Sequence, residues 1–111
     1  MIEITIKEFV EQRISAPLFF EYPKEAPGRF VILKMQTDPR EEFLESAILV
    51  ADSYAPSLLE AMRLNEEVKN ALDALSELDC IAGSHRGGDY PFPDTANKRR
   101  RYQAVQNITH Y

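Results

Sequence analysis

The segment from residue 55 to residue 78, APSLLEAMRLNEEVKNALDALSEL, constrains the fold more than any other part of the chain. Ser57 and Glu60 have the spacing of a capping box, in which each side chain satisfies a backbone donor that the first helical turn leaves open. Asn65 interrupts the apolar stripe that follows and is a candidate position for a bend. The pattern predicts a long amphipathic helix. Its expected buried stripe consists of Leu58, Ala61, Met62, Val68, Leu72 and Leu75.

Runs rich in apolar, β-branched and aromatic residues flank this helix and predict five strands. Three precede it, over residues 17–22, 29–36 and 42–54, and two follow it, over residues 80–86 and 101–111. Because the links between the first three strands are short, we expect these strands to pair as an antiparallel meander. Residues 2–14 have helical spacing and predict a short amphipathic helix. The order predicts an α+β fold, in which an antiparallel sheet of about five strands packs against a short N-terminal helix and one long helix.

The composition is that of one soluble domain spanning residues 1–111. Hydrophobic residues make up 44% and charged residues 28%, which is usual for a globular protein. No apolar run approaches the roughly 18–20 residues of a membrane helix, so no membrane contact is expected. The acidic start, MIEITIKEFVEQ, lacks the layout of an export signal. The single cysteine, Cys80, cannot form an internal disulfide, which fits a reducing compartment.

Two of the predicted strands carry apolar residues on both faces, because side chains alternate along a strand. In the second strand, Val31, Leu33 and Met35 point one way and Phe30 and Ile32 the other. The third strand is expected to place Leu44, Ile48 and Val50 on one side and Phe43, Ala47 and Leu49 on the reverse. Burying one such large side chain contributes about 1.5–3 kcal/mol, so both faces require cover.

Two arrangements provide that cover. The two helices can lie on opposite faces, or both helices can lie on one face while the other face meets a second copy of the chain. The alternation alone favours neither arrangement. In the second case, the expected self-association face contains Phe30, Ile32, Phe43 and Leu49.

Candidate catalytic groups are few. Cys80 and His85 are five residues apart, so on one strand they face opposite sides and do not form a nucleophile and its base. Cys80, His85 and Asp89 also lack the paired spacing of metal ligands. The pair Gly87 and Gly88 has no phosphate-binding pattern around it and reads as the entry to a loop. We therefore predict no catalytic residue, no metal ligand and no cofactor site.

The basic run KRRR, residues 98–101, ends a long polar segment that is expected to be a loop over residues 87–100. Tyr90 and Tyr102 would be the aromatic neighbours of a nucleic-acid patch. The net charge of −5 argues against general nucleic-acid binding, which depends on neutralising phosphates. Strand alternation would also split the basic residues between two faces. Contact with protein, or charge pairing with Asp89, Asp94 and the acidic third strand, is the favoured interpretation.

Three segments carry a family resemblance: FEYPKEAPGRFVILK, SYAPSLLEAMRLNEEVKNAL and DYPFPDTANKRRRYQAVQNITHY. Together they resemble the tail completion proteins of long-tailed bacteriophages, the small tail-terminator class also found in prophages of Gram-positive bacteria. The likeness covers residues 17–111 and lies in arrangement and segment character. It implies that Tyr22 and Pro23 open the first hairpin, and that Asp94 lies in a loop before the Arg101-Tyr102 strand.

The resemblance implies a sheet with helices on one face and a homo-hexameric ring. Such a ring caps the tail tube protein and meets the head-side connector protein in the virion neck, after assembly in the bacterial host cytoplasm. It implies no catalysed reaction and no cofactor, and DNA would pass through without specific binding, which suits an acidic chain. The 87–100 segment would then be an arm that contacts a neighbouring subunit or the tube. The expected contact residues are Tyr90, Phe92, Asp94, Arg99, Arg101 and Tyr102.

Two other functions are compatible with the same residues. One is another non-enzymatic neck component, such as a head-completion or stopper protein. The other is a small nucleic-acid-binding regulatory domain that uses the basic run.

Overall fold

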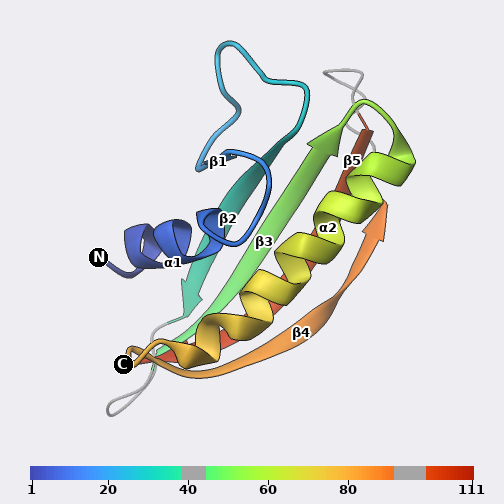
Figure 1. Cartoon of the computed structure of the whole chain (residues 1–111). Coiled ribbons are helices and arrows are strands. Elements are labelled where there is room, and N and C mark those ends of the chain that lie inside the picture. The colour runs from blue at the N-terminus through green and yellow to red at the C-terminus, as the bar shows by residue number, and fades with distance from the viewer. Residues whose placement is uncertain (39–44, 92–99) are drawn as a thin grey trace.

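One five-stranded sheet forms the centre of the molecule, with strand order β1-β2-β3-β5-β4 (Figure 1). The computed structural model describes residues 1–38, 45–91 and 100–111. The elements are α1 (Ile2–Glu11), β1 (Leu18–Phe19), β2 (Phe30–Asp38), β3 (Glu45–Ala55), α2 (Leu58–Asp73), a 3₁₀ turn η1 (Ala74–Glu77), β4 (Ile81–Pro91) and β5 (Arg100–His110). The predicted α+β class, with a short N-terminal helix and one long helix, is confirmed. Neither α-helix is long and apolar enough to cross a membrane.

The expected meander of the first three strands is wrong at its beginning. β2 and β3 pair antiparallel as predicted, but β1 is only two residues long and runs parallel to β2. Tyr22 and Pro23 therefore lie in a connection between parallel strands and do not open a hairpin. The aromatic residues that favoured a longer first strand leave the sheet, and Tyr22 packs across the rings of Phe30 and Tyr54.

The fourth strand is longer than predicted and shortens the expected loop. β4 continues through Gly87 and Gly88 to Pro91, paired with β5. An irregular register between Arg86 and Gly88 lets the strand continue, and Gly88 has a φ of +117°, a conformation that favours glycine. Both glycines are therefore strand residues, and residues 92–99 of the predicted loop lie outside the described residues.

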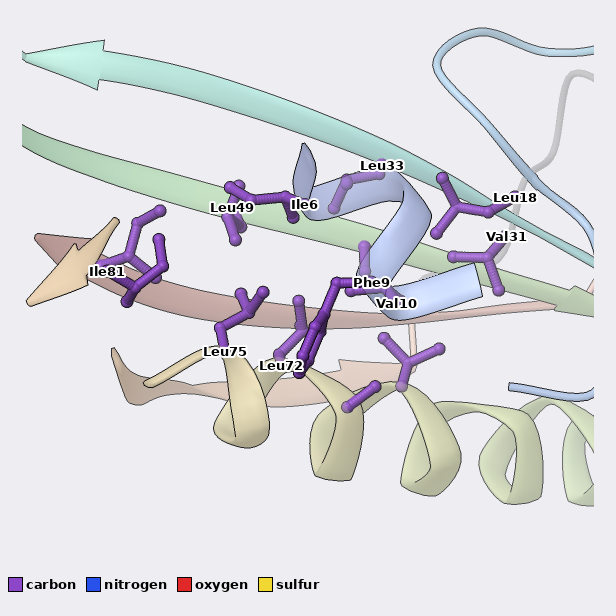
Figure 2. Close-up of a cluster of buried hydrophobic side chains, with 14 of the residues drawn as sticks. Ile6, Phe9, Val10, Leu18, Val31, Leu33, Leu49, Leu72, Leu75 and Ile81 are labelled. Atoms are coloured by element: carbon purple, nitrogen blue, oxygen red, sulfur yellow. The ribbon is translucent and has the colours of Figure 1, made fainter. Parts of the chain in front are cut away.

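Both helices lie on the same face of the sheet, and the main core fills the space between them (Figures 1 and 2). The α1 residues Ile6, Phe9 and Val10 are buried there. Alternation sends every second residue of β2 and β3 to this side, which includes Leu33 and Leu49. Of the two arrangements that the sequence left open, the structure has both helices on one face. The remaining large core residues are Leu18, Val31, Leu64, Val68, Leu72, Leu75, Ile81 and Ile108.

The predicted start of α2 is confirmed, whereas its predicted buried stripe is only partly right. Ser57 Oγ accepts a hydrogen bond from Glu60 N at 3.2 Å, which is the first half of the predicted capping box. The Glu60 carboxylate accepts from the Ser57 hydroxyl at 3.2 Å, where the box was expected to engage a backbone N–H. Asn65 is buried and the helix continues through it. Leu58 and Met62 are exposed instead of buried, while Leu64, absent from the predicted stripe, is fully enclosed. The stripe is therefore rotated in the first turns of the helix.

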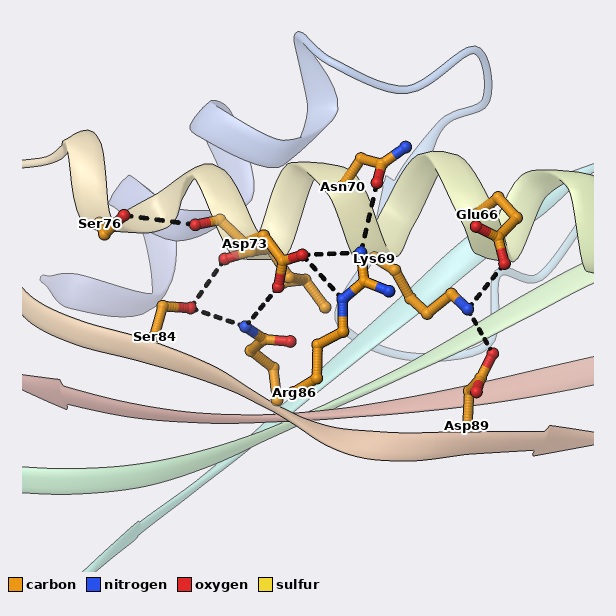
Figure 3. Close-up of polar contacts among 10 residues, drawn as sticks. Glu66, Lys69, Asn70, Asp73, Ser76, Ser84, Arg86 and Asp89 are labelled. Atoms are coloured by element: carbon orange, nitrogen blue, oxygen red, sulfur yellow. Dashed lines mark hydrogen bonds and ion pairs between the residues drawn. The ribbon is translucent and has the colours of Figure 1, made fainter.

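Polar contacts fasten α2 to the edge strand β4 (Figure 3). Arg86 Nε donates to Asp73 Oδ2 at 2.7 Å, and its Nη2 donates to Asn70 Oδ1 at 3.3 Å. Ser84 Oγ donates to the carbonyl oxygen of Leu72 at 2.8 Å. Further along, Lys69 Nζ lies 2.7 Å from Asp89 Oδ2. These contacts fix the helix over a strand whose own side chains contribute little to the core.

The neighbouring residues Leu49 and Ile48 test which face of the sheet is the core, since Leu49 is 0% exposed and Ile48 is 41% exposed. We expect Leu49→Ala to lower the free energy of unfolding by about 2–5 kcal/mol, because it leaves a cavity between sheet and helices. Ile48→Ala is expected to cost about 1 kcal/mol or less. Urea denaturation followed by circular dichroism measures both. Equal losses in the two variants would contradict the assignment of faces.

The Asp73–Arg86 contact predicts acid sensitivity. The hydrogen bond from Arg86 holds the pKa of Asp73 below its usual value of 3.8. Because the unfolded state takes up the proton first, the contact stabilises the fold above the usual pKa of Asp73 and is lost as pH falls through the lower, folded value. Asp73→Asn should therefore unfold at a lower urea concentration than wild type at pH 6, and the two midpoints should converge toward pH 2. A difference that stays constant with pH would refute this role.

Candidate assembly surface

The sheet face opposite α1 and α2, here called the open face, is assembled from cross-strand rows of side chains. Strand register and alternation define its members. One row, for example, runs from Ile32 through Asp52 and Gln103 to Tyr90. The open face consists of the side chains of Phe30, Ile32, Lys34, Gln36, Ser46, Ile48, Val50, Asp52, Tyr54, His85, Tyr90, Arg101, Gln103, Val105, Asn107 and Thr109.

One end of the open face is closed by the chain itself. The rings of Phe30 and Tyr54 stack with centroids 4.5 Å apart. Tyr22 meets both rings edge-on, at 5.4 and 5.7 Å, and Phe19 approaches Phe30 at 6.1 Å. The connection between β1 and β2 thus folds over this end of the sheet and encloses its aromatic residues, together with Ile32.

The predicted self-association face does not exist as one exposed surface. Phe30 and Ile32 do share the open face, but both are buried beneath the aromatic cover just described. Leu49 lies on the opposite side of the sheet in the helix-covered core, because its cross-strand partner is Met35. Phe43 lies outside the described residues. The expectation that Phe30, Ile32 and Leu49 are available to a second copy is therefore wrong.

The middle of the open face carries a buried carboxylate. Asp52 is 1% exposed, and its Oδ1 accepts a hydrogen bond from Gln103 Nε2 at 2.8 Å. Its Oδ2 lies 3.8 Å from Arg101 Nη1 and 3.6 Å from Lys34 Nζ. The Tyr90 hydroxyl donates to Gln103 Oε1, which links the edge strand to the same network. Groups from β2, β4 and β5 thus surround this carboxylate from β3, and its Oδ2 has ion-pair neighbours but no hydrogen-bond partner among the described residues.

The other end of the open face is hollowed and accessible. A hollow of about 570 Å³ is bordered by Gln36, Ile48, His85, Asn107 and Thr109, among other residues. Ile48 is an exposed isoleucine in the middle of this polar border. Val50 and Val105, which pair with each other across β3 and β5, are half-buried. This end therefore combines accessible apolar area with amide, hydroxyl and imidazole groups, a composition typical of a protein interface.

The predicted contact residues separate in the structure. Tyr90 and Arg101 lie on the open face, whereas Tyr102 lies on the helix side and borders a second hollow with Leu59 and Met62. Phe92, Asp94 and Arg99 fall outside the described residues. The six residues were expected to act together, but the three described ones are divided between two faces.

Charge pairing of the basic run is confirmed in part. Arg101 pairs with Asp52 of the third strand, as the acidic character of that strand suggested, and also donates to the Tyr54 hydroxyl at 3.1 Å. Asp89 pairs with Lys69 on α2 and lies on the opposite side of the sheet from Arg101. The alternation that was expected to split the run places Arg101 in the open face and leaves Arg100 exposed on the other side.

Sequence reasoning missed Asp52 and Gln103, the two residues that connect this network. Asp52 was available as a signal, because it is the only charged residue within the apolar run ILVADSYA. A carboxylate in a strand with apolar neighbours on both faces calls for a cationic partner nearby in the sheet. Its partner Arg101, however, comes from β5. The sequence alone gives neither the order of the strands nor the register between β3 and β5.

The comparisons with known proteins add no relative. Neither a scan against models of protein families nor a search of curated protein sequences finds a match to this chain. Within residues 1–38, 45–91 and 100–111, no group of three or more His, Cys, Asp and Glu side chains could hold a metal ion. The surface considered below as a candidate site is the hollowed end of the open face.

Asp52 has two cationic neighbours of very different exposure, and this difference gives a prediction. The side chain of Arg101 is 14% exposed and that of Lys34 is 61% exposed. Arg101→Met should lower the free energy of unfolding by about 3–5 kcal/mol, because it leaves a buried carboxylate short of its partner. Lys34→Met should cost about 1 kcal/mol or less, since exposed ion pairs contribute little. Thermal or urea unfolding measures both, and an equal effect of the two substitutions would disprove the network.

Proposed function

We propose that this chain is a non-enzymatic structural protein of a long-tailed bacteriophage or prophage. In this proposal, copies of the chain form a hexameric ring that caps the tail tube and joins it to the head. The ring acts in the neck of the virion and assembles in the bacterial host cytoplasm. The proposal rests on the resemblance of residues 17–111 to tail completion proteins.

The arrangement of the helices is the observation that supports this function best. Tail completion proteins are expected to have a sheet with its helices on one face, and here α1 and α2 share one face (Figure 1). The sequence alone left this arrangement open, so it is an independent point of agreement. Neither of the described α-helices covers the opposite face.

The contact between copies is proposed to lie at the hollowed end of the open face. Ile48 is exposed there, and it is surrounded by Gln36, His85 and Asn107, whose side chains can bond across an interface. The apolar residues proposed for this contact are Ile48, Val50 and Val105. The residues expected from the sequence, Phe30, Ile32 and Leu49, are enclosed within one chain. The net charge of −5 fits a conduit through which DNA passes without adhering.

Another neck component remains the alternative, because a head-completion or stopper protein would use the same surface chemistry. A nucleic-acid-binding function has less support, since Arg101, one of the four basic residues, is engaged with Asp52. Mixing the purified protein with tail tubes and, separately, with head connectors distinguishes the terminator from the other neck proteins.

Two exposed isoleucines of similar accessibility provide the test of this function. Ile48 on the open face is 41% exposed, and Ile4 on α1 is 46% exposed. We expect Ile48→Asp to abolish ring formation and tube capping, because it places a charge in the contact between copies, while Ile4→Asp assembles as wild type does. Light scattering measures the oligomer, electron microscopy of tubes assembled from the tail tube protein of the same genome measures capping, and thermal unfolding verifies that both variants fold.

Two results would each overturn the proposal. One is wild-type protein that neither caps such tubes nor forms rings in their presence. The other is an Ile48→Asp variant that caps tubes as well as the Ile4→Asp control does, which would remove the open face as the contact surface.

A further inference from the structure

The hollow at the accessible end of the open face is concave and carries no formal charge on its described border. Its volume is about 570 Å³, and it is bordered by Ile48, which is 41% exposed, together with amide, hydroxyl and imidazole side chains. None of the described residues that border it is an aspartate, a glutamate, a lysine or an arginine. An occupant that fits this hollow is therefore convex and apolar, with donors or acceptors for the polar border.

The first turns of α2 carry three exposed apolar side chains, here called the α2 knob. Leu58 is 46% exposed, Leu59 is 55% exposed and Met62 is 42% exposed. Met62 follows the two leucines by four and three residues, so all three side chains form one patch on the helix surface. Single exposed apolar residues are ordinary, whereas a contiguous group of them marks an interaction surface.

The knob also offers hydrogen-bond donors that suit the border of the hollow. The first backbone N–H groups of a helix have no acceptor within the helix. Ser57 Oγ accepts from the N–H of Glu60, which leaves the N–H groups of Leu58 and Leu59 for acceptors outside the helix. The side-chain amides and hydroxyls on the border of the hollow supply such acceptors. The two surfaces thus match in apolar character and in hydrogen bonding.

The knob and the hollow of one chain cannot meet each other. β3 runs from the hollow, where Ile48 lies near its beginning, to Ala55, which directly precedes the turn into α2. Figure 1 shows the start of α2 and the end of β2, which borders the hollow, at opposite ends of a molecule that measures 44 × 25 × 24 Å. The hollow also lies on the open face, away from both helices. A knob that fills it must come from another molecule.

Shape favours a contact in which the knob of one copy meets the hollow of another. Two hollows placed face to face would enclose empty space, and two knobs would share little area, whereas a knob in a hollow permits the close packing of a protein interior. Such a contact leaves each pair of copies with one free knob and one free hollow. It therefore repeats from copy to copy, and it closes into a ring when the rotation between neighbours allows.

We propose that the α2 knob of one copy inserts into the open-face hollow of the next copy, where Leu59 packs against Ile48. Like the proposed function on which it rests, this contact joins copies of the chain into a ring, and it identifies the surface that fills the hollow. One repeated contact then covers both the exposed isoleucine of the open face and the exposed apolar residues of α2.

The test mixes two variants, each of which blocks one half of the contact. Ile48→Asp blocks the hollow and Leu59→Asp blocks the knob, and an acidic residue is compatible with the first turn of a helix. Alone, each variant should self-associate about tenfold more weakly than wild type or worse, because an apolar contact is lost. Mixed in equal amounts, the two should form heterodimers and nothing larger, since one intact knob and one intact hollow remain. Sedimentation velocity at protein concentrations up to about 1 mM measures each sample.

A third variant and a second pair of substitutions serve as controls. Ile4→Asp lies on α1 outside both surfaces and should assemble as wild type does. Circular dichroism verifies that each variant folds, and Ile48→Lys or Met62→Lys replaces a variant that does not. Three results would each overturn the proposal: wild-type protein that stays monomeric, a Leu59→Asp variant that assembles like wild type, or a mixture that gives no heterodimers.

Failure of this contact and failure of the proposed function give different results. Heterodimers from the mixture, together with wild-type rings that leave tail tubes uncapped, would keep the contact and remove the terminator function. Rings that cap tubes, together with a mixture that gives no heterodimers, would keep the function and remove the contact.

Discussion

The rest of the structure depends on the packing of two helices against the same set of alternate strand residues. Val31 and Leu33 of β2 and Leu49 of β3 face the helices, and α1 and α2 meet over them. One core therefore holds α1, α2 and the sheet together. Because neighbouring strand residues point in opposite directions, the residues that face the helices also determine which residues form the open face. Everything that distinguishes the open face, including its aromatic end and its buried carboxylate, follows from the absence of a described helix there.

The open face has no cover from α1 or α2, and its side chains are shielded differently at its two ends and in its middle. At one end, the β1–β2 connection lays Tyr22 over Phe30 and Tyr54. In the middle, the charged groups of Arg101 and Lys34 lie 3.8 and 3.6 Å from the carboxylate of Asp52. At the far end no comparable cover exists among the described residues, and Ile48 stays exposed. The accessible apolar area is therefore much smaller than the sequence pattern suggested, and it is confined to one end of the sheet.

The sequence predicted those features that depend on interactions between residues close together in the chain. The capping box at Ser57 and the class of fold were readable because they depend on residues close together in the chain. The direction of β1 was not, since it depends on aromatic packing between Tyr22 and residues of β2 and β3. The sequence also could not predict that Leu49 faces the helices. Alternation shows which residues of one strand share a face, whereas the register between β2 and β3 decides which faces of the two strands coincide. The Arg101–Asp52 pair depends on the same long-range register.

The two accessible apolar regions lie on opposite sides of the sheet, and this placement restricts how the protein can assemble. Ile48 belongs to the open face, whereas Leu58, Leu59 and Met62 belong to the outer side of α2. One flat contact cannot bury both regions, so a single copy has two separate surfaces to offer. A subunit in a closed ring needs two contact surfaces for its neighbours, and a ring that joins two structures needs further surfaces for them. If the open face is one of the two surfaces used between neighbouring copies, the exposed apolar residues of α2 can serve as the second surface or contact a different protein.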